Sequence, residues 1–199
     1  MGQYLFIRHG ESDINVYGIL SDSTENNSLT ERGIKQARRT GEQLKGVRFD
    51  GIVSSPVRRA YETAKIISEY VNLDVIRDDR LREVKLGKAN GHNINEFMEE
   101  LYPKSHITGK IREELEMEGW EHLISRIVSC MDDYNGKYIF VSHSDPIRAA
   151  IAYTLNMDEG DTYGITVKNA SITGIDTDKK KLLCIGSINL DDKIKSLFK

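Results

Sequence analysis

The sequence contains only two cysteines, Cys130 and Cys184, and they lie in unrelated apolar surroundings. Neither has metal-ligand spacing to another ligand type, and two such thiols do not build a disulfide framework. This cysteine usage is typical of a reducing cytoplasm, where we expect the protein to work. Long apolar runs are missing as well. The N-terminal MGQYLFIRHG is too briefly apolar for a signal peptide, and no later segment is long enough to span a bilayer, so no membrane partner is expected.

Charge of one sign is not in excess, because the formal net charge is −3 at pH 7 over 199 residues. The sequence therefore gives no electrostatic reason to expect nucleic acid as a partner. An anionic ligand would have to be held by a few placed cations. The nucleotide-binding motifs are missing too: there is no G-x-G-x-x-G, and Lys104 stands where a P-loop ending at Gly109-Lys110 needs its first glycine.

Short apolar runs alternate with amphipathic stretches, a pattern that predicts an α/β domain. The candidate strands are Gln3–Arg8, Asp50–Ser55, Leu73–Ile76 and Lys137–His143, followed by ASITGID and KLLCIGSI. The last two are joined by the polar TDKKK and predict an antiparallel hairpin. We expect a three-layer sandwich, with a mixed, mainly parallel central sheet flanked by helices, in a single domain over residues 1–199.

Three helices have recognisable beginnings. The first spans about Thr30–Leu44, with Thr30 as its N-cap. The second follows SSP, where Ser55 can cap the helix and Pro56 fits the first helical position. The third follows VSHSDP in the same way, with Asp145 as cap. Between about residues 92 and 135 the chain becomes helix-rich and highly charged, and we expect this segment to be a helical insert that leans over the sheet.

Polar side chains of an unusual kind follow three of the predicted strands. Arg8 and His9 follow the first, Arg58 and Arg59 follow the second, and His143 ends the fourth. Ligands of open α/β sheets bind at the carboxyl ends of the central strands. If these strands are neighbours, two histidines and at least two arginines share one crevice.

Each of these residues also has a simpler interpretation. A lone histidine after a strand is more often structural than catalytic, and Arg8 alone can be an ordinary surface ion-pair residue. Arg58 and Arg59, however, both lie in the first turn of a helix, where the helix dipole disfavours cations. An anion at that helix end would compensate for them. The free backbone amides after His143 can contribute to the same anion site.

Two further residues complete a candidate site. Asn15 lies within one turn of it and carries an amide donor, although alone it reads as a turn or cap residue. Glu83 lies between basic neighbours and glycines in RLREVKLGKANG and can serve as an acid. By composition alone, Glu83 is not distinguished from the many surface glutamates.

Five blocks of sequence, taken together and in order, resemble the histidine phosphatase superfamily, also called the phosphoglycerate mutase-like family. The blocks are RHGES..N (Arg8–Asn15), LTERGIKQA (Leu29–Ala37), SSPVRRAYETA (Ser54–Ala64), LREVKLGKANG (Leu81–Gly91) and VSHSDPIRA (Val141–Ala149). R-H-G alone would be a weak signal. The resemblance covers most of the chain, and it implies that the helical insert lies over the active site.

The resemblance implies a role for each matching residue. His9 would be the nucleophile that becomes phosphorylated, with Gly10 letting the chain turn away after it. Arg8, Arg59 and His143 would clamp the phosphoryl oxygens, with Asn15 and the backbone amide of Ser144 as further donors. Glu83 would be the proton donor, and Arg58 a bystander. The catalytic set is thus His9, Glu83, His143, Arg8 and Arg59, and the phosphate-binding set Arg8, Asn15, Arg59, His143 and Ser144.

The chemistry places demands on these residues. A histidine attacks phosphorus only as neutral imidazole, and nearby arginines lower its pKa. Glu83 must hold a proton when the leaving oxygen departs, and we expect a raised pKa there. No metal is required. One departure from the family pattern is Ser144-Asp145, because a small pair often follows the second histidine; the Asp145 carboxylate would repel a phosphate unless it turns away to cap its helix.

The acceptor of the phosphoryl group stays open at this point. With water as acceptor the protein is a phosphatase of small phosphorylated metabolites, which needs no cofactor. With phosphoglycerate it is a mutase primed by 2,3-bisphosphoglycerate. The short chain lacks the long insertions of typical mutases and favours hydrolysis. The insert carries Lys104, His106, Lys110 and Arg112, which either hold a substrate carboxylate or form a solvated charged face. A phospho-ligand binding protein without turnover is the non-enzymatic alternative, and a homodimer is left open.

Overall fold

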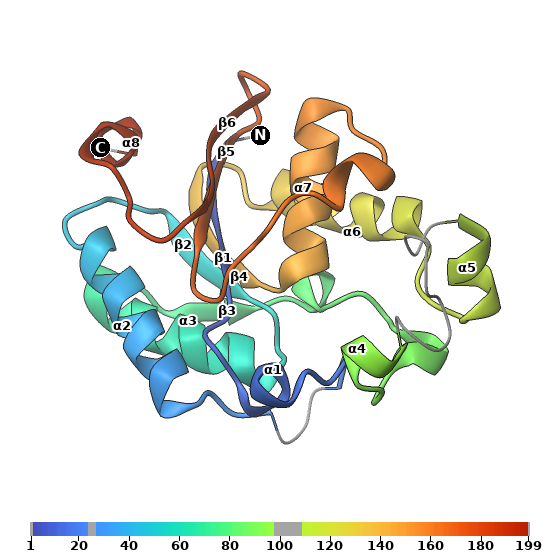
Figure 1. Ribbon diagram of the computed structural model, residues 1–199. Helices are drawn as coiled ribbons and strands as arrows, with labels where there is room; N and C mark the ends of the chain where they lie inside the picture. The colour runs from blue at the N-terminus through green and yellow to red at the C-terminus, as the bar shows by residue number, and fades with distance from the viewer. Residues whose placement is uncertain (1, 24–26, 98–108, 199) are drawn as a thin grey trace.

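Six strands form one sheet in the computed structural model, which describes residues 2–23, 27–97 and 109–198. The strands are β1 (Gln3–Arg8), β2 (Gly51–Ser54), β3 (Val75–Arg77), β4 (Lys137–Ser142), β5 (Ile172–Asp176) and β6 (Lys181–Ser187). Their order is β3-β2-β4-β1-β5-β6 (Figure 1). The first four strands in this order pair in parallel. β5 is antiparallel to β1, and β6 is antiparallel to β5. The mixed, mainly parallel sheet with its terminal hairpin is therefore confirmed.

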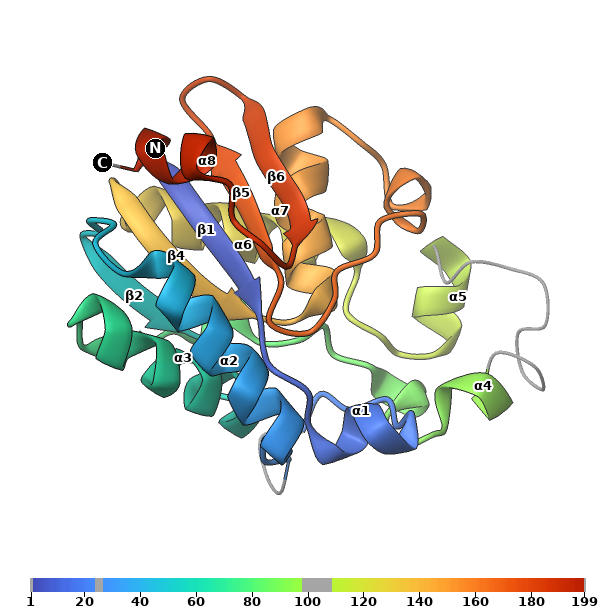
Figure 2. The same cartoon turned by 60° about the vertical axis from the view of Figure 1, so that its left-hand side comes forward.

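Helices cover both faces of this sheet. Side chains alternate between the faces along a strand, and in β1 Tyr4 and Phe6 join one apolar cluster while Leu5 and Ile7 join the other. The helices are α2 (Glu31–Leu44) and α3 (Arg58–Val71) on one side, and α6 (Trp120–Asp133) and α7 (Ser144–Leu155) on the other (Figure 2). Burial on both faces explains why β1 is a continuous apolar run. The three-layer prediction is confirmed.

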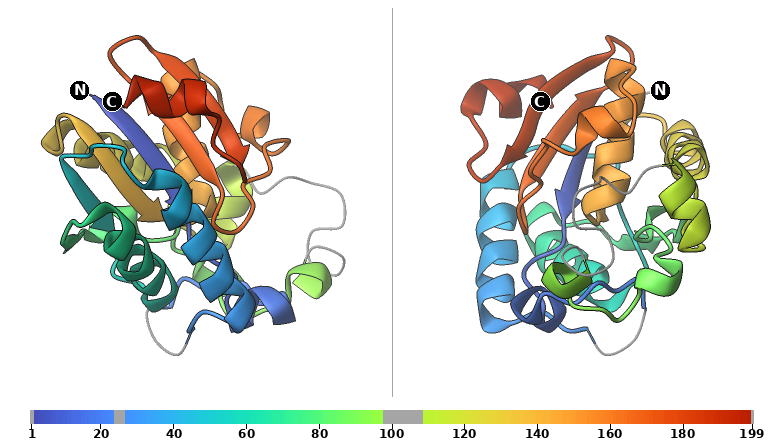
Figure 3. Two further views of the ribbon diagram at one scale, coloured as in Figure 1. Left: turned by 90° about the vertical axis from the view of Figure 1, so that its left-hand side faces the viewer. Right: turned by 45° about the vertical axis from the view of Figure 1, so that its right-hand side comes forward.

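Short helices gather beyond the carboxyl ends of β1 and β4 (Figure 3). They are α1 (Asp13–Tyr17), α4 (Ile94–Glu96) and α5 (Gly109–Glu114), together with the 3₁₀ helix η2 (Gly87–Ala89). The 3₁₀ helix η1 (Asp79–Leu81) packs against α6 and β4, η4 (Gly160–Thr162) packs against α7, and α8 (Asp192–Leu197) lies near the C-terminus. Within the described residues, no helix combines the length and the apolar character that crossing a membrane requires.

Of the three helix N-caps predicted from the sequence, the structure confirms one. Thr30 caps α2 as predicted, because its Oγ1 accepts a hydrogen bond from the Gly33 amide at 3.0 Å. The Ser55 cap is wrong: α3 begins at Arg58 with Val57 at the N-cap position. Ser55 Oγ instead lies 2.9 Å from Nε2 of His143, so this hydroxyl serves a neighbouring strand end.

The helix after β4, in contrast to α3, begins earlier than predicted. β4 ends at Ser142, a single residue of extended backbone follows, and α7 starts at Ser144 with His143 in the N-cap position. Asp145 is therefore inside the first turn and is not the cap. Its carboxylate pairs with Arg148, one turn along the same helix, at 2.9 Å.

Candidate active site

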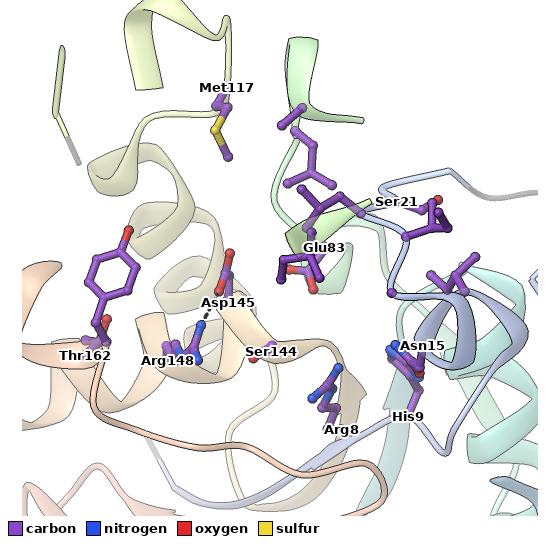
Figure 4. A pocket seen from close by; sticks show the side chains of 18 of the residues that line it. Arg8, His9, Asn15, Ser21, Glu83, Met117, Ser144, Asp145, Arg148 and Thr162 are labelled. Carbon is purple, nitrogen blue, oxygen red and sulfur yellow. Dashed lines mark hydrogen bonds and ion pairs between the residues drawn. The ribbon is translucent and has the colours of Figure 1, made fainter. Parts of the chain in front are cut away.

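The carboxyl ends of β1, β2 and β4 meet at one edge of the sheet, because Arg8 pairs with Ser142 and Ser54 pairs with Val141 in the parallel ladders. A cavity of about 590 Å³ opens there. Figure 4 shows its wall from close by. Of the residues predicted for the site, the cavity is lined by Arg8, His9, Asn15, Arg59, Glu83 and Ser144. The structure thus brings six predicted residues together from five separate segments of the chain.

His9 is held as a neutral imidazole in a single tautomer. Its side chain is buried, and Nδ1 lies 2.7 Å from the carbonyl oxygen of Gly10. A carbonyl only accepts, so Nδ1 carries the proton and Nε2 keeps its lone pair. Arg59 Nε donates to this Nε2 at 3.1 Å. Burial, followed by the charges of Arg59 and Arg8, holds the pKa of His9 well below its ordinary value. The atom left available for attack on phosphorus is Nε2.

Gly10 packs closely against the backbone of helix α2. Its backbone is outside the left-handed region, so positive φ is not the reason for a glycine at this position. A Cβ at Gly10 would lie 2.6 Å from the carbonyl oxygen of Gly33, and one at Gly33 would lie 2.0 Å from that of Glu11. The backbone after His9 therefore rests directly on the first turn of α2, which a side chain at either glycine would prevent.

Two arginines, Arg8 and Arg59, line the cavity beside His9. Arg8 Nη1 donates to Val167 O at 2.7 Å, and Arg59 Nη2 donates to Ser21 O at 3.0 Å. Arg8 Nε and Arg59 Nη1 are buried without a hydrogen-bond partner in the described structure. Burial lowers the pKa of Arg59 to about 10, which leaves it cationic at neutral pH. Unpaired buried donors are costly, so an anion that accepts from both is the natural occupant.

Asn15 and Ser144 provide neutral donors at the same end. Three donors meet at Asn15 Oδ1: the Ser12 amide, the Ser12 hydroxyl and Asn169 Nδ2, each at 3.1 Å. This arrangement fixes the orientation of the amide and leaves its nitrogen as a donor. Ser144 is the first residue of α7, where backbone N–H groups have no partner within the helix.

His143 lies behind Arg59 and does not line the cavity. Its ring is fully buried, with a centroid 5.2 Å from that of His9. Arg59 Nη2 lies 3.2 Å from Nδ1 of His143 and donates to it, so Nε2 carries the proton and donates to Ser55 Oγ. His143 therefore fixes the orientation of the Arg59 guanidinium. Its direct contact with phosphoryl oxygens stays a prediction.

Glu83 comes from the loop between η1 and η2, on the opposite wall from Arg8 (Figure 4). Burial, the charge of Asp145 and the low polarity of the wall oppose its ionisation, whereas the Val84 amide, Arg59 and Arg8 favour it; the resulting pKa is about 7. A carboxyl group with this pKa exchanges a proton readily at neutral pH. The raised pKa matches the expectation for a proton donor.

The Glu83 loop is held from behind by α6. Arg126 donates to the carbonyl oxygens of Arg80 and Glu83, the latter at 3.2 Å, and its Nε pairs with Glu118 at 2.8 Å. Glu118 Oε2 in turn accepts from the Lys85 amide at 3.2 Å. These supporting residues were missed by the sequence analysis, since nothing local marks Arg126 among the many charged residues of α6.

Two further arginines line the cavity away from its phosphate end, and each has a carboxylate partner. Arg112 is only 5% exposed and pairs with Glu159 at 2.6 Å. Arg148 pairs with Asp145 and also donates to Ile165 O at 3.2 Å. The interpretation of Arg112 as part of a solvated charged face is wrong, because the insert folds it against Glu159. Asp145 does not turn away from the cavity; it forms part of the wall.

The remaining predicted cations lie elsewhere. Arg58 is 54% exposed in its side chain and pairs with Glu62 on the surface of α3, so it is not part of the cavity. Lys110 is exposed, and Lys104 and His106 lie outside the described residues. Across the described ranges, no group of three His, Cys, Asp or Glu side chains is arranged to hold a metal ion.

Comparisons with known proteins agree with this geometry. Residues 4–187 match the family model of the histidine phosphatase superfamily (branch 1). A 2,3-bisphosphoglycerate-dependent phosphoglycerate mutase of Thermoplasma acidophilum is 51% identical over 191 residues, which cover 96% of this chain and 95% of the relative. Phosphoserine phosphatase 1 of Hydrogenobacter thermophilus is 31% identical, with 91% and 89% of the two chains covered.

Solved structures add support for the fold alone. A mycobacterial glucosyl-3-phosphoglycerate phosphatase has a TM-score of 0.78 at 24% identity, covering 93% of this chain and 99% of its own. A phosphoglycerate mutase from Bacillus anthracis has the same TM-score and identity, covering 98% and 95%. With the matched family model over nearly the whole length, the conclusion is direct. The chain belongs to the histidine phosphatase superfamily and is an enzyme of its phosphatase and phosphoglycerate mutase type.

Proposed function

We propose that the protein is a 2,3-bisphosphoglycerate-dependent phosphoglycerate mutase that interconverts 2- and 3-phosphoglycerate through a phosphohistidine at His9. The observation that carries the choice of reaction is the 51% identity, over nearly the full length of both chains, to the Thermoplasma acidophilum protein of that name. The short chain no longer favours hydrolysis, because that relative is covered to 95% of its own length.

The phosphate end supports phosphoryl transfer without reference to the acceptor. Nε2 of His9 forms the N–P bond as the P–O bond of the ester breaks, and the leaving oxygen takes the proton of Glu83. Arg8 Nε and Arg59 Nη1, the unpaired donors, donate hydrogen bonds to the phosphoryl oxygens and stabilise their negative charge in the transition state. Glu83, now ionised, then removes the proton of the incoming hydroxyl, which attacks phosphorus and releases His9.

The residues also fit the priming phosphate. In a mutase cycle 2,3-bisphosphoglycerate supplies the phosphoryl group that loads His9 before turnover. The two orphaned guanidinium donors, the free amide nitrogen of Asn15 and the first amides of α7 form a cradle for one phosphoryl group. Nothing in this set requires a metal ion.

Hydrolysis is the second candidate, and one observation favours it. Among the described residues that line the cavity beyond the phosphate end, both arginines, Arg112 and Arg148, already have a carboxylate partner. This wall offers paired charges of both signs, which suit a zwitterionic phosphomonoester better than an additional carboxylate. The 31% identical relative is named a phosphoserine phosphatase.

The two reactions are separated by one assay. The protein is incubated with 3-phosphoglycerate, with and without 2,3-bisphosphoglycerate, and 2-phosphoglycerate and free phosphate are followed separately; phosphoserine is tested in parallel. Isomerisation that depends on the primer, with little phosphate released, is the expected result. Rapid release of phosphate without isomerisation would replace the mutase by a phosphatase.

The nucleophile is tested in the same experiment. An acid-labile phosphate trapped on the wild-type protein should be absent from His9→Ala, and the matched pair Arg59→Gln and Arg58→Gln should differ strongly in activity, because only Arg59 faces the cavity. If phosphorylated ligands bind but no residue becomes phosphorylated, the non-enzymatic alternative of a phospho-ligand binding protein is correct and the proposal fails.

A further inference from the structure

Asp145 stands where the sequence departs from the family pattern, and the structure places its carboxylate on the cavity wall. It is held there by one ion pair, whose arginine is itself anchored. Asp145 Oδ1 lies 2.9 Å from Arg148 Nη1, and Arg148 Nε is anchored on the carbonyl oxygen of Ile165. Figure 4 shows Asp145 and Glu83 on neighbouring parts of the wall, above Arg8. A fixed carboxylate that faces a reacting carboxyl group acts on its proton.

The charges around Glu83 come from every element packed against it. Asp145 on α7 opposes its ionisation, whereas Arg8 after β1 and Arg59 on α3 favour it, together with the Val84 amide. Burial adds to the effect of Asp145 and is the largest contribution. Burial and Asp145 together outweigh Arg59 and Arg8, so the pKa of Glu83 stays above its ordinary value.

The other charged groups near this loop are neutralised by partners. Arg126 on α6 contacts Glu83 at its backbone carbonyl oxygen, and its charge is paired with Glu118. On the loop itself, Arg82 pairs with Asp79 at the surface. Asp22 accepts a hydrogen bond from the Leu86 amide at 2.8 Å. Glu159, another carboxylate on the cavity wall, pairs with Arg112. Among the described residues, Asp145 is the carboxylate whose charge opposes the ionisation of Glu83.

We propose that Asp145 is a positioning residue for the proton on Glu83, and that Arg148 sets the strength of its effect. Asp145 stabilises the protonated form of Glu83 against the pull of Arg8 and Arg59. Arg148 partly neutralises Asp145 and so keeps the proton transferable. This inference deepens the proposed function, in which Glu83 protonates the leaving oxygen, and it rests on that function for its catalytic consequence.

The two substitutions have opposite signs. Asp145→Asn removes a negative charge, so Glu83 loses its proton at lower pH and the basic limb of kcat/KM moves down by about one pH unit. Arg148→Gln removes the positive charge that neutralises Asp145, so the basic limb moves to higher pH. A purely structural role would lower activity in both variants without moving the limbs in opposite directions.

The limb is measured as phosphohistidine formation with 2,3-bisphosphoglycerate as the phosphoryl donor, and again with p-nitrophenyl phosphate. The aryl leaving group needs little protonation, so the displacement of the limb should be large with 2,3-bisphosphoglycerate and small with p-nitrophenyl phosphate. In parallel, the Glu83 carboxyl carbon is titrated by carbon-13 NMR in the free protein, with Glu83→Gln identifying the signal.

Asp192→Asn is the matched control. Asp192 lies in the first turn of α8 and pairs with Lys195 three residues on, as Asp145 pairs with Arg148, but it is fully exposed and far from the cavity. This variant should leave the limb and the NMR titration in place. Asp145→Glu, which keeps the charge, should restore most of the wild-type profile.

Displacements in the same direction, or an Asp145→Asn profile that coincides with the wild type, would overturn the inference. If Asp145→Asn does not fold, the Arg148→Gln variant decides alone. A basic limb that does not move to higher pH in this variant contradicts the proposal. The NMR titration separates the two levels: opposite displacements without any phosphohistidine uphold the electrostatic relationship and remove the proposed function. If phosphohistidine forms but the titration of Glu83 is the same in all variants, the proposed function is upheld and the electrostatic relationship is wrong.

Discussion

Arg59 Nε lies 3.1 Å from Nε2 of His9 and donates a hydrogen bond to this nitrogen, which we propose as the atom that attacks phosphorus. The lone pair is therefore occupied before substrate arrives, and the arginine must exchange this bond for one to a phosphoryl oxygen. The same guanidinium contacts His143 through Nη2 and leaves Nη1 unpaired. Arg59 thus links the nucleophile, the second histidine and the phosphate position in one planar group.

We expect Arg59→Lys to lower kcat/KM by about 10²- to 10³-fold, the usual cost of removing a donor that stabilises transition-state charge. Lysine keeps the charge but not the planar fork that reaches three partners. Steady-state kinetics with 3-phosphoglycerate measures the effect. Arg58→Lys, one residue away and on the surface, should change it little, and similar losses in both variants would contradict this role of Arg59.

The free energy of unfolding should decrease as the pH is lowered, because both histidines are buried as neutral rings. Burial and the neighbouring arginine Arg59 hold the pKa of His9 and of His143 well below the ordinary value. The unfolded chain binds protons below about pH 6.5, whereas the folded protein does not, so the free energy of unfolding decreases as pH drops through that value towards the lowered folded-state pKa. Each histidine contributes about 1.4 kcal/mol per pH unit well inside this window.

Denaturant unfolding at pH 7 and at pH 5.5 measures this dependence. His143→Gln should make the loss between the two pH values smaller than in the wild type, whatever its stability at pH 7. His92→Gln, at an exposed position, is the control and should keep the wild-type difference. Equal pH dependence in all three proteins would show that His143 is not neutral when folded.

The buried Arg112–Glu159 pair predicts a strong context effect on stability. Arg112→Met should cost about 3–5 kcal/mol, because it leaves the Glu159 carboxylate buried without its cation and with only the Tyr163 hydroxyl as a donor. Removing both charges, in Arg112→Met with Glu159→Leu, should recover much of that loss. Denaturant unfolding of the two single variants and the double variant closes the cycle, and additive losses would count against a buried ion pair.

Arg126 should affect the acid more than the phosphate site. Arg126→Gln removes the contacts that hold the Glu83 loop, and we expect a larger loss of kcat with 3-phosphoglycerate than with p-nitrophenyl phosphate, whose leaving group needs little protonation. Comparing the two substrates at pH 7 measures this. Equal losses would place the defect at the phosphate end.

The sheet and the phosphate end could be predicted because their signals are local. An apolar run that stops at Arg8 and His9 marks both the strand and its ligand edge. The position of His143 could not be predicted in the same way, because its place behind the cavity depends on Arg59 and Ser55, which are distant in the sequence. The burial of Arg112 likewise depends on Glu159, which lies in a separate segment.

The supporting groups around Glu83 illustrate the same limit. Glu83 was identified by its place in a family-like block, but its proton affinity depends on Asp145 from a segment after β4. Whether Asp145 caps its helix or faces the cavity is decided by where α7 begins. That boundary moved by two residues from the expectation, and such a shift turns a side chain to a different face of the helix.

The contact between Gly10 and Gly33 ties the reactive loop to a helix that contributes nothing to the cavity wall. The position of the backbone after His9 therefore depends on a second, remote glycine, because a side chain at Gly33 would displace that backbone. A library that varies α2 as an inert scaffold would lose activity at Gly33 without touching a single active-site side chain. Design on this scaffold has to treat that helix as part of the catalytic apparatus.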